Sequence, residues 1–195
     1  ATACKGTTRI YNPAKEPEIV DLQRFLQRCG VQIDGAGGGL IEFTGGPVTN
    51  DPEHTVIPDR IATVTYFAAC CAAGGDIELL GVNPDHWRPI FELLKNAGAE
   101  LSVTPAGVRM KAEKLRAAGV IQTSPYPGFP TDAQAPFMAA MATAEGQTKF
   151  TETIFKSRFG HVEELVRMGA RIVIDGQTAL VTGVPTLYGA DVRAA

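Results

Sequence analysis

Acidic and basic side chains near predicted helix starts are the residues of this sequence best suited to chemistry. In residues 126–132, Pro127 and Pro130 stiffen the backbone just before Asp132, at a predicted helix start. The helix dipole favours a charged carboxylate there, which can accept a proton or a hydrogen bond from a sugar hydroxyl. A simple helix cap is the alternative, and residue type alone favours the cap.

Two further places combine charges that suit an anion. In residues 151–161, Arg158 and His161 are expected one turn apart on one helix face, where a phosphate can meet both near the helix N-terminus. A solvated surface pair is the alternative. Asp191 and Arg193 are either a phosphate-binding pair or part of a frayed terminus.

Charged residues also stand at two other predicted helix starts. Glu16 and Glu18 flank the start of the first helix, where acidic side chains complement the helix dipole. Asp59 and Arg60 occupy the corresponding point of a later helix. A structural role is favoured for the glutamates, and a site role is the alternative.

The histidines, cysteines and glycines give no metal or phosphate motif. The histidines lack i, i+4 pairing and a nearby cysteine, so we expect no metal site. The four cysteines are expected to be small buried hydrophobes. Residues 35–39 resemble a phosphate cradle but lack the following Lys-Ser/Thr, so a hairpin loop is expected.

Composition favours a globular protein that binds neither nucleic acid nor membrane. The chain has 195 residues, 45% of them hydrophobic, and a net charge of -3 with scattered Lys and Arg. Apolar runs stay well short of the roughly 18 to 20 residues that span a bilayer. We therefore expect a cytoplasmic protein.

The elements that must position these residues follow an internal repeat. Helices of amphipathic spacing end at Gly30, Gly98 and Gly169, which are 68 and 71 residues apart. Asp59 and Asp132 are 73 residues apart. The repeated unit is strand, helix, strand, helix and a strand pair, which predicts an α/β fold with two buried, Ala-rich helices.

The repeats suggest a division of the chain. A polar, proline-containing crossover at residues 48–57 separates residues 1–47 from residues 58–195. The chain starts at Ala1 without a start signal, so a fragment of a longer protein is expected.

Five motifs in order resemble the enolpyruvyl transferase family, specifically the UDP-N-acetylglucosamine 1-carboxyvinyltransferases. They cover essentially the whole chain: residues 15–21, 57–61, 127–134, 151–161 and 189–193. The resemblance implies six βαβαββ units in an inside-out α/β barrel, present here in part. Residues 1–47 would be the last unit of one domain, and residues 58–195 two units and the start of a third.

The resemblance also implies a reaction and roles. Enolpyruvyl would pass from phosphoenolpyruvate to the 3-hydroxyl of UDP-N-acetylglucosamine by addition and elimination, releasing phosphate without metal or organic cofactor. This is the first committed step of peptidoglycan synthesis. Asp132 would take the hydroxyl proton, and Ile154 would contact the UDP-sugar through its backbone, with Phe155 beside it. Arg158, Asp191 and Arg193 would line the cleft near phosphoenolpyruvate.

The family pattern is incomplete here. Its N-terminal Lys-Asn pair, reactive-Cys loop and later phosphate-binding Arg have no counterparts, so the missing remainder of the polypeptide is an expected partner and this chain alone is expected to be inactive. Two alternatives stay open: an enzyme that uses shikimate 3-phosphate, and a non-catalytic module that binds nucleotide sugars.

Overall fold

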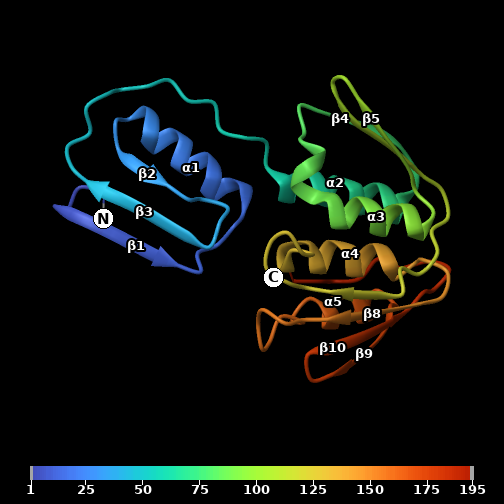
Figure 1. Ribbon diagram of the computed structural model, residues 1–195. Coiled ribbons are helices and arrows are strands. Elements are labelled where there is room, and N and C mark those ends of the chain that lie inside the picture. The colour runs from blue at the N-terminus through green and yellow to red at the C-terminus, as the bar shows by residue number, and fades with distance from the viewer. Residues whose placement is uncertain (1, 194–195) are drawn as a thin grey trace. The chain divides into compact units, whose positions relative to one another are not determined.

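The computed structural model describes residues 2–193. The chain divides into two compact units, and the boundary along the sequence lies between Pro58 and Asp59. Figure 1 shows each unit as helices lying against small sheets.

The first unit places one helix beside a three-stranded antiparallel sheet of order β1-β3-β2. The helix has Pro17 at its first position and is followed by Gly30, whose φ of +93° is one that glycine adopts without strain. The loop of residues 35–39 joins two paired strands, so the hairpin prediction is confirmed. The bounds are β1 (Gly6–Tyr11), α1 (Pro17–Arg28), β2 (Gln32–Asp34) and β3 (Leu40–Gly45).

A stretch without helix or strand follows β3 and is fastened to α1. The backbone N–H groups of Thr49 and Asn50 donate to the carbonyl of Cys29, at 3.0 and 3.2 Å. Further along, His54 Nε2 lies 3.1 Å from Asp21 Oδ2 in a largely buried contact. These bonds fix the path of the polar segment along its own unit.

The second unit opens with a helix-rich repeat built on an antiparallel sheet of order β4-β6-β5. Its first helix is capped by Asp59, whose Oδ1 accepts hydrogen bonds from the N–H groups of Ile61 and Ala62. Strands β5 and β6 pair antiparallel, as expected of the strand pair that closes the repeated unit. The bounds are α2 (Arg60–Ala73), β4 (Gly75–Leu80), the 3-10 turn η1 (Pro84–Trp87), α3 (Arg88–Ala97), β5 (Glu100–Thr104) and β6 (Gly107–Ala112).

The second repeat is a full βαβαββ unit. Strands β7 and β8 are parallel and are joined through α4, whereas β10 pairs antiparallel with both β8 and β9, giving the order β7-β8-β10-β9. The bounds are β7 (Val120–Gln122), the 3-10 turn η2 (Thr131–Ala133), α4 (Gln134–Met141), β8 (Gln147–Thr151), α5 (Val162–Arg167), β9 (Arg171–Asp175) and β10 (Thr178–Thr182).

The core of the second unit lies between its two Ala-rich helices, α2 and α4, which pack against each other (Figure 1). Phe67 and Phe137 are fully buried there, as the sequence predicted for these helices. Cys70 and Cys71 are buried too, and burial, with the neighbouring Cys70 thiol, raises the pKa of Cys71 to about 12. Among residues 2–193, no helix has both the length and the apolar character to cross a bilayer.

Candidate functional site

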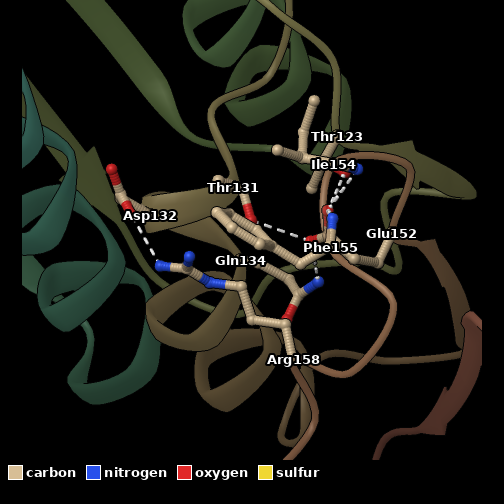
Figure 2. Close-up of polar contacts among 8 residues, drawn as sticks. All are labelled: Thr123, Thr131, Asp132, Gln134, Glu152, Ile154, Phe155 and Arg158. Atoms are coloured by element: carbon tan, nitrogen blue, oxygen red, sulfur yellow. Dashed lines mark hydrogen bonds and ion pairs between the residues drawn. The ribbon is translucent and has the colours of Figure 1, made fainter.

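Asp132 forms an ion pair with Arg158. Asp132 lies within the η2 turn, and its Oδ1 accepts a hydrogen bond from Arg158 Nη2 at 2.5 Å (Figure 2). The side chains are 55% and 36% exposed, so solutes can reach both charges. Within residues 2–193, the Asp132 side chain caps neither η2 nor α4, so the cap expectation from residue type is wrong. The carboxylate faces the loop after β8 instead.

Arg158 lies in that loop rather than on a helix. Because α5 begins only at Val162, the prediction that Arg158 and His161 share a helix face is wrong. The guanidinium lies 4.9 Å from the centre of the Phe155 ring, a cation–π contact that orients it toward Asp132. Gly160 separates Arg158 from α5, and glycine disfavours extension of the helix backward.

His161 directly precedes α5, near Arg158. Burial of its ring lowers its pKa, and the positive charge of Arg158 lowers it further from the ordinary value of 6.5. A neutral imidazole is therefore the dominant form at pH 7. A neutral imidazole still has an N–H that can donate to an anion, so the grouping of Arg158 and His161 around a phosphate stays a prediction.

The segment before Asp132 is a tightly closed loop. Ser124 N–H donates to the Phe129 carbonyl at 2.9 Å, and Gly128 N–H donates to the Pro125 carbonyl at 2.9 Å. A Cβ atom on Gly128 would lie 1.7 Å from Ser124 Oγ, so only glycine fits this turn. The buried Phe129 ring meets Phe137 edge to face, which ties the loop to α4.

Arg60, a candidate from the sequence, lies over this loop. Its guanidinium is 5.6 Å from the centre of the Tyr126 ring. The neighbouring Asp59 is the cap of α2, so its side chain has a structural task. The structure thus associates Arg60 with the Asp132 loop and assigns Asp59 to the helix.

Glu152 is a residue that our sequence analysis did not single out. It follows β8 directly and is 1% exposed, yet its carboxylate accepts five hydrogen bonds (Figure 2). The donors are Thr123 Oγ1, Thr131 Oγ1, Gln134 Nε2 and the N–H groups of Ile154 and Phe155. The two N–H groups belong to the residues just after Glu152, whereas the three side-chain donors lie 18 to 29 residues away in sequence, so strand periodicity gives no sign of them.

The hydrogen bonds keep the Glu152 carboxylate charged. Burial by itself raises the pKa of a carboxyl group, because the charged form loses its water. Here hydrogen bonds outweigh the effect of burial and lower the pKa of Glu152 below the ordinary 4.5. They come from the N–H of Ile154, the hydroxyls of Thr131 and Thr123, and the N–H of Phe155. A buried anion therefore stands between the Asp132 turn and the following loop.

The other predicted site residues lie in several places. Ile154 and Phe155 are 40% and 47% exposed in the loop that leads to Arg158. Asp191 and Arg193 are exposed, and the backbone N–H of Arg193 donates to Glu164 Oε2 at 3.1 Å. Within residues 2–193, no hydrogen bond or ion pair joins them to Asp132 or Arg158, so their grouping stays a prediction.

Glu16 and Glu18 belong to the first unit. The Glu16 carbonyl accepts from the N–H groups at the start of α1, and Glu18 lies in the first turn of that helix. This position complements the helix dipole, which was the structural interpretation of both residues. Their role at a site remains a prediction.

The arrangement suits a reaction that moves a proton from a hydroxyl beside an anion. Asp132 can accept a proton or a hydrogen bond, and Arg158 can exchange its carboxylate partner for a phosphate or carboxylate of a ligand. Ile154 and Phe155 supply an exposed apolar wall next to these charges. This combination suits acid–base chemistry next to a bound anion.

Comparison with known families shows which family the chain belongs to. The family model for EPSP synthase (3-phosphoshikimate 1-carboxyvinyltransferase) matches residues 1–195. The chain belongs to this enolpyruvyl transferase family. The resemblance found in the sequence motifs is thereby confirmed at the level of the family.

Two curated relatives of this enolpyruvyl transferase chain share a name. UDP-N-acetylglucosamine 1-carboxyvinyltransferase from Thermodesulfovibrio yellowstonii is 49% identical over 195 residues, which are 100% of this chain and 47% of the relative. The enzyme of the same name from Xanthobacter autotrophicus is 47% identical, with 100% and 46% coverage. The chain therefore spans about half the length of the curated relatives it matches.

Solved structures confirm the expected fold. The enolpyruvyl transferase NikO from Streptomyces tendae aligns with a TM-score of 0.79 and 26% identity, over 94% of this chain and 44% of NikO. EPSP synthase from Acinetobacter baumannii aligns at 0.51 and 19% identity, which bears on fold alone. The enolpyruvyl transferase fold is thus present here over less than half of its full extent.

Proposed function

We propose that this chain forms one side of the active site of an enolpyruvyl transferase that acts on UDP-N-acetylglucosamine. The observation that carries the proposal is the exposed Asp132–Arg158 pair beside Ile154. It occurs in a chain 49% identical to an enzyme named for that acceptor. The rest of the cleft comes from the remainder of a longer polypeptide, which supplies the groups that this chain lacks.

Asp132 is the general base of the proposed reaction. It takes the proton of the sugar 3-hydroxyl as the hydroxyl oxygen attacks C2 of phosphoenolpyruvate, while an acid from the remainder of the polypeptide protonates C3. Loss of a C3 proton together with the phosphate then restores the double bond and gives the enolpyruvyl ether. Its 55% exposure supports this role, because a hydroxyl of a bound substrate can come within hydrogen-bonding distance. Asp132 can therefore receive the proton directly from the sugar hydroxyl.

Arg158 is the anion-binding residue. In the absence of substrate it neutralises Asp132, and on binding its guanidinium turns toward a substrate phosphate or carboxylate. This exchange frees the Asp132 carboxylate when the substrate arrives. The contact with Phe155 supports the exchange, because stacking keeps the guanidinium in place while its polar partner changes.

The wider assignments rest on the same proposal. Residues 1–47 form the last unit of one transferase domain, residues 48–57 the crossover, and residues 58–195 most of the other domain. Asp191 and Arg193 join the phosphoenolpyruvate side of the cleft once the rest of the polypeptide is present. The enzyme acts in the cytoplasm, in peptidoglycan synthesis.

A second candidate acceptor is shikimate 3-phosphate. The matching family model carries the name of the enzyme that uses it, which is the observation in its favour. Identity of 45–49% over the whole chain to enzymes named for UDP-N-acetylglucosamine favours the nucleotide sugar instead.

An acceptor comparison tests the proposal. Phosphate release from phosphoenolpyruvate is measured with the full-length polypeptide that contains these residues, with either UDP-N-acetylglucosamine or shikimate 3-phosphate. We expect release with the nucleotide sugar and an enolpyruvyl ether as the second product. Release only with shikimate 3-phosphate identifies the sister reaction, and release with neither supports a non-catalytic module that binds nucleotide sugars.

A further inference from the structure

We propose that Glu152 is a positioning residue that holds Asp132 and the Arg158 loop in their working geometry. The inference rests on the proposed function, because it assigns Glu152 a task at that same site. Glu152 lies beneath the site at 1% exposure and touches neither charge of the Asp132–Arg158 pair. It acts through the backbone and side chains that flank them.

The two carboxylate oxygens of Glu152 serve the two sides of the site. Oε2 accepts from Thr131 Oγ1 at 2.8 Å and from Gln134 Nε2 at 2.7 Å, which are the residue before Asp132 and the residue two after it. Oε1 accepts from the N–H groups of Ile154 and Phe155 at 2.7 and 3.1 Å. One carboxylate thus sets the distance between the Asp132 turn and the loop that carries Arg158.

Glu152 is itself fixed from the opposite side. Its N–H donates to the Gln177 carbonyl at 2.8 Å, and Gln177 Nε2 donates to the carbonyls of Glu152 and Phe155 at 3.1 and 3.2 Å. Gln177 lies in the turn between β9 and β10. The loop after β8 is therefore held between a rigid hairpin and the Glu152 side chain, which leaves it little freedom to shift.

The first repeat of the same unit is an internal control. Gly81 N–H donates to the Ala106 carbonyl at 2.8 Å, just as Glu152 N–H donates to Gln177, so Gly81 and Glu152 are equivalent positions. Counted from Asp59 and Asp132, Pro58 and Ile61 are equivalent to Thr131 and Gln134. The repeat that lacks the Asp132–Arg158 pair has these residues in place of the polar cluster: Pro58, Ile61, Gly81 and Ala106.

The comparison separates a task in function from a task in folding. A similar strand, turn and helix form around Gly81 without a buried carboxylate, so this local fold does not require one. Burying a charge is costly unless hydrogen bonds replace its water, and the second repeat supplies five of them. Charge-assisted hydrogen bonds are shorter and stronger than neutral ones, which suits a group that must hold two segments rigidly.

Glu152→Gln in the full-length polypeptide tests the proposal, because the amide keeps the shape and removes the charge. We expect kcat for phosphate release to fall about 10- to 100-fold, in line with the effect of a small misplacement of catalytic groups. The dissociation constant for UDP-N-acetylglucosamine changes by less than about threefold, since its other contacts remain. The amides of Ile154 and Phe155 exchange hydrogen faster than in the wild type.

Two variants serve as controls. Val181→Ala removes two buried methyl groups from β10, which lowers stability without changing a residue of the site. Glu163→Gln neutralises an exposed carboxylate on α5. Both are expected to keep the wild-type kcat and the wild-type exchange of the two amides. Where Glu152→Gln does not fold, Thr131→Val removes one donor to Oε2, with an expected fall in kcat of about 3- to 10-fold.

Failure of the positioning proposal and failure of the proposed function give different results. The positioning proposal is overturned if amide exchange at Ile154 and Phe155 in Glu152→Gln equals that of the wild type. It is also overturned if kcat falls no further than in Val181→Ala at a matched melting temperature. A wild-type protein that releases no phosphate overturns the proposed function instead, and the exchange experiment still reports on the geometry without any activity.

Discussion

The two repeats of the second unit each place an aspartate before a helix, and the two aspartates have different tasks. Asp59 caps α2, with hydrogen bonds from Ile61 and Ala62, whereas Asp132 pairs with Arg158 across a loop. The difference arises because a 3-10 turn precedes α4 and lifts Asp132 away from the helix amides. One supersecondary pattern thus yields an aspartate that caps a helix and an aspartate that pairs with an arginine.

The largest expected effect on activity comes from replacing Asp132. Asp132→Asn should lower phosphate release about 10²- to 10⁴-fold, because an amide cannot accept the hydroxyl proton. The matched control is Asp76→Asn, which removes the acid of another Asp–Arg pair, with Arg109 in the first repeat. That variant should keep its activity in the same phosphate-release assay. Equal losses in both would show that the pairs do not differ in task.

For stability, the loss of Asp59 should matter more than the loss of Asp132. Asp59→Ala should cost about 0.5–2 kcal/mol of unfolding free energy, the usual cost of losing a helix cap. Asp132→Ala should cost about 0–1 kcal/mol, because exposed ion pairs contribute little. Urea unfolding of both variants measures the difference. A larger loss for Asp132→Ala would contradict the division of tasks between the two aspartates.

The smallest expected effect is a change in pH dependence. The folded chain lowers the pKa of Glu152, so its contribution to stability is complete above the ordinary value of 4.5 and is lost as pH falls through the lower folded value. Glu152→Gln removes this contribution, so its melting temperature should fall less steeply with acid below about pH 4.5 than that of the wild type. Melts across this range measure the slopes, and identical slopes would mean that folding does not lower the pKa of Glu152.

The sequence predicted much of the fold because its signals are local. Gly30, Gly98 and Gly169 end their helices or the turns that follow, and each has the positive φ that favours glycine. The Ala-rich helices are buried, as their lack of a polar face required. Each of these features depends on neighbours along the chain.

The candidate site was predicted in part. Asp132, Ile154 and Arg158 were singled out, and the structure brings Asp132 and Arg158 into contact. The start of α5 was predicted too early, because an apolar spacing that includes Phe159 continues the helical pattern although Gly160 interrupts the helix. Glu152 was missed because its side-chain partners, Thr123, Thr131 and Gln134, lie on other segments. Alignment of the two repeats supplies the signal, since a glutamate stands where the first repeat has Gly81.

The loop after β8 has a consequence for protein engineering. Its course is set by main-chain N–H groups bonded to Glu152, while the Ile154 side chain is 40% exposed and the Phe155 ring packs against Arg158. Randomising Ile154 alone therefore changes the exposed surface of the loop while leaving the loop's course and the Phe155–Arg158 contact intact. Under the proposed function, such a library is a direct route to variants with altered acceptor preference.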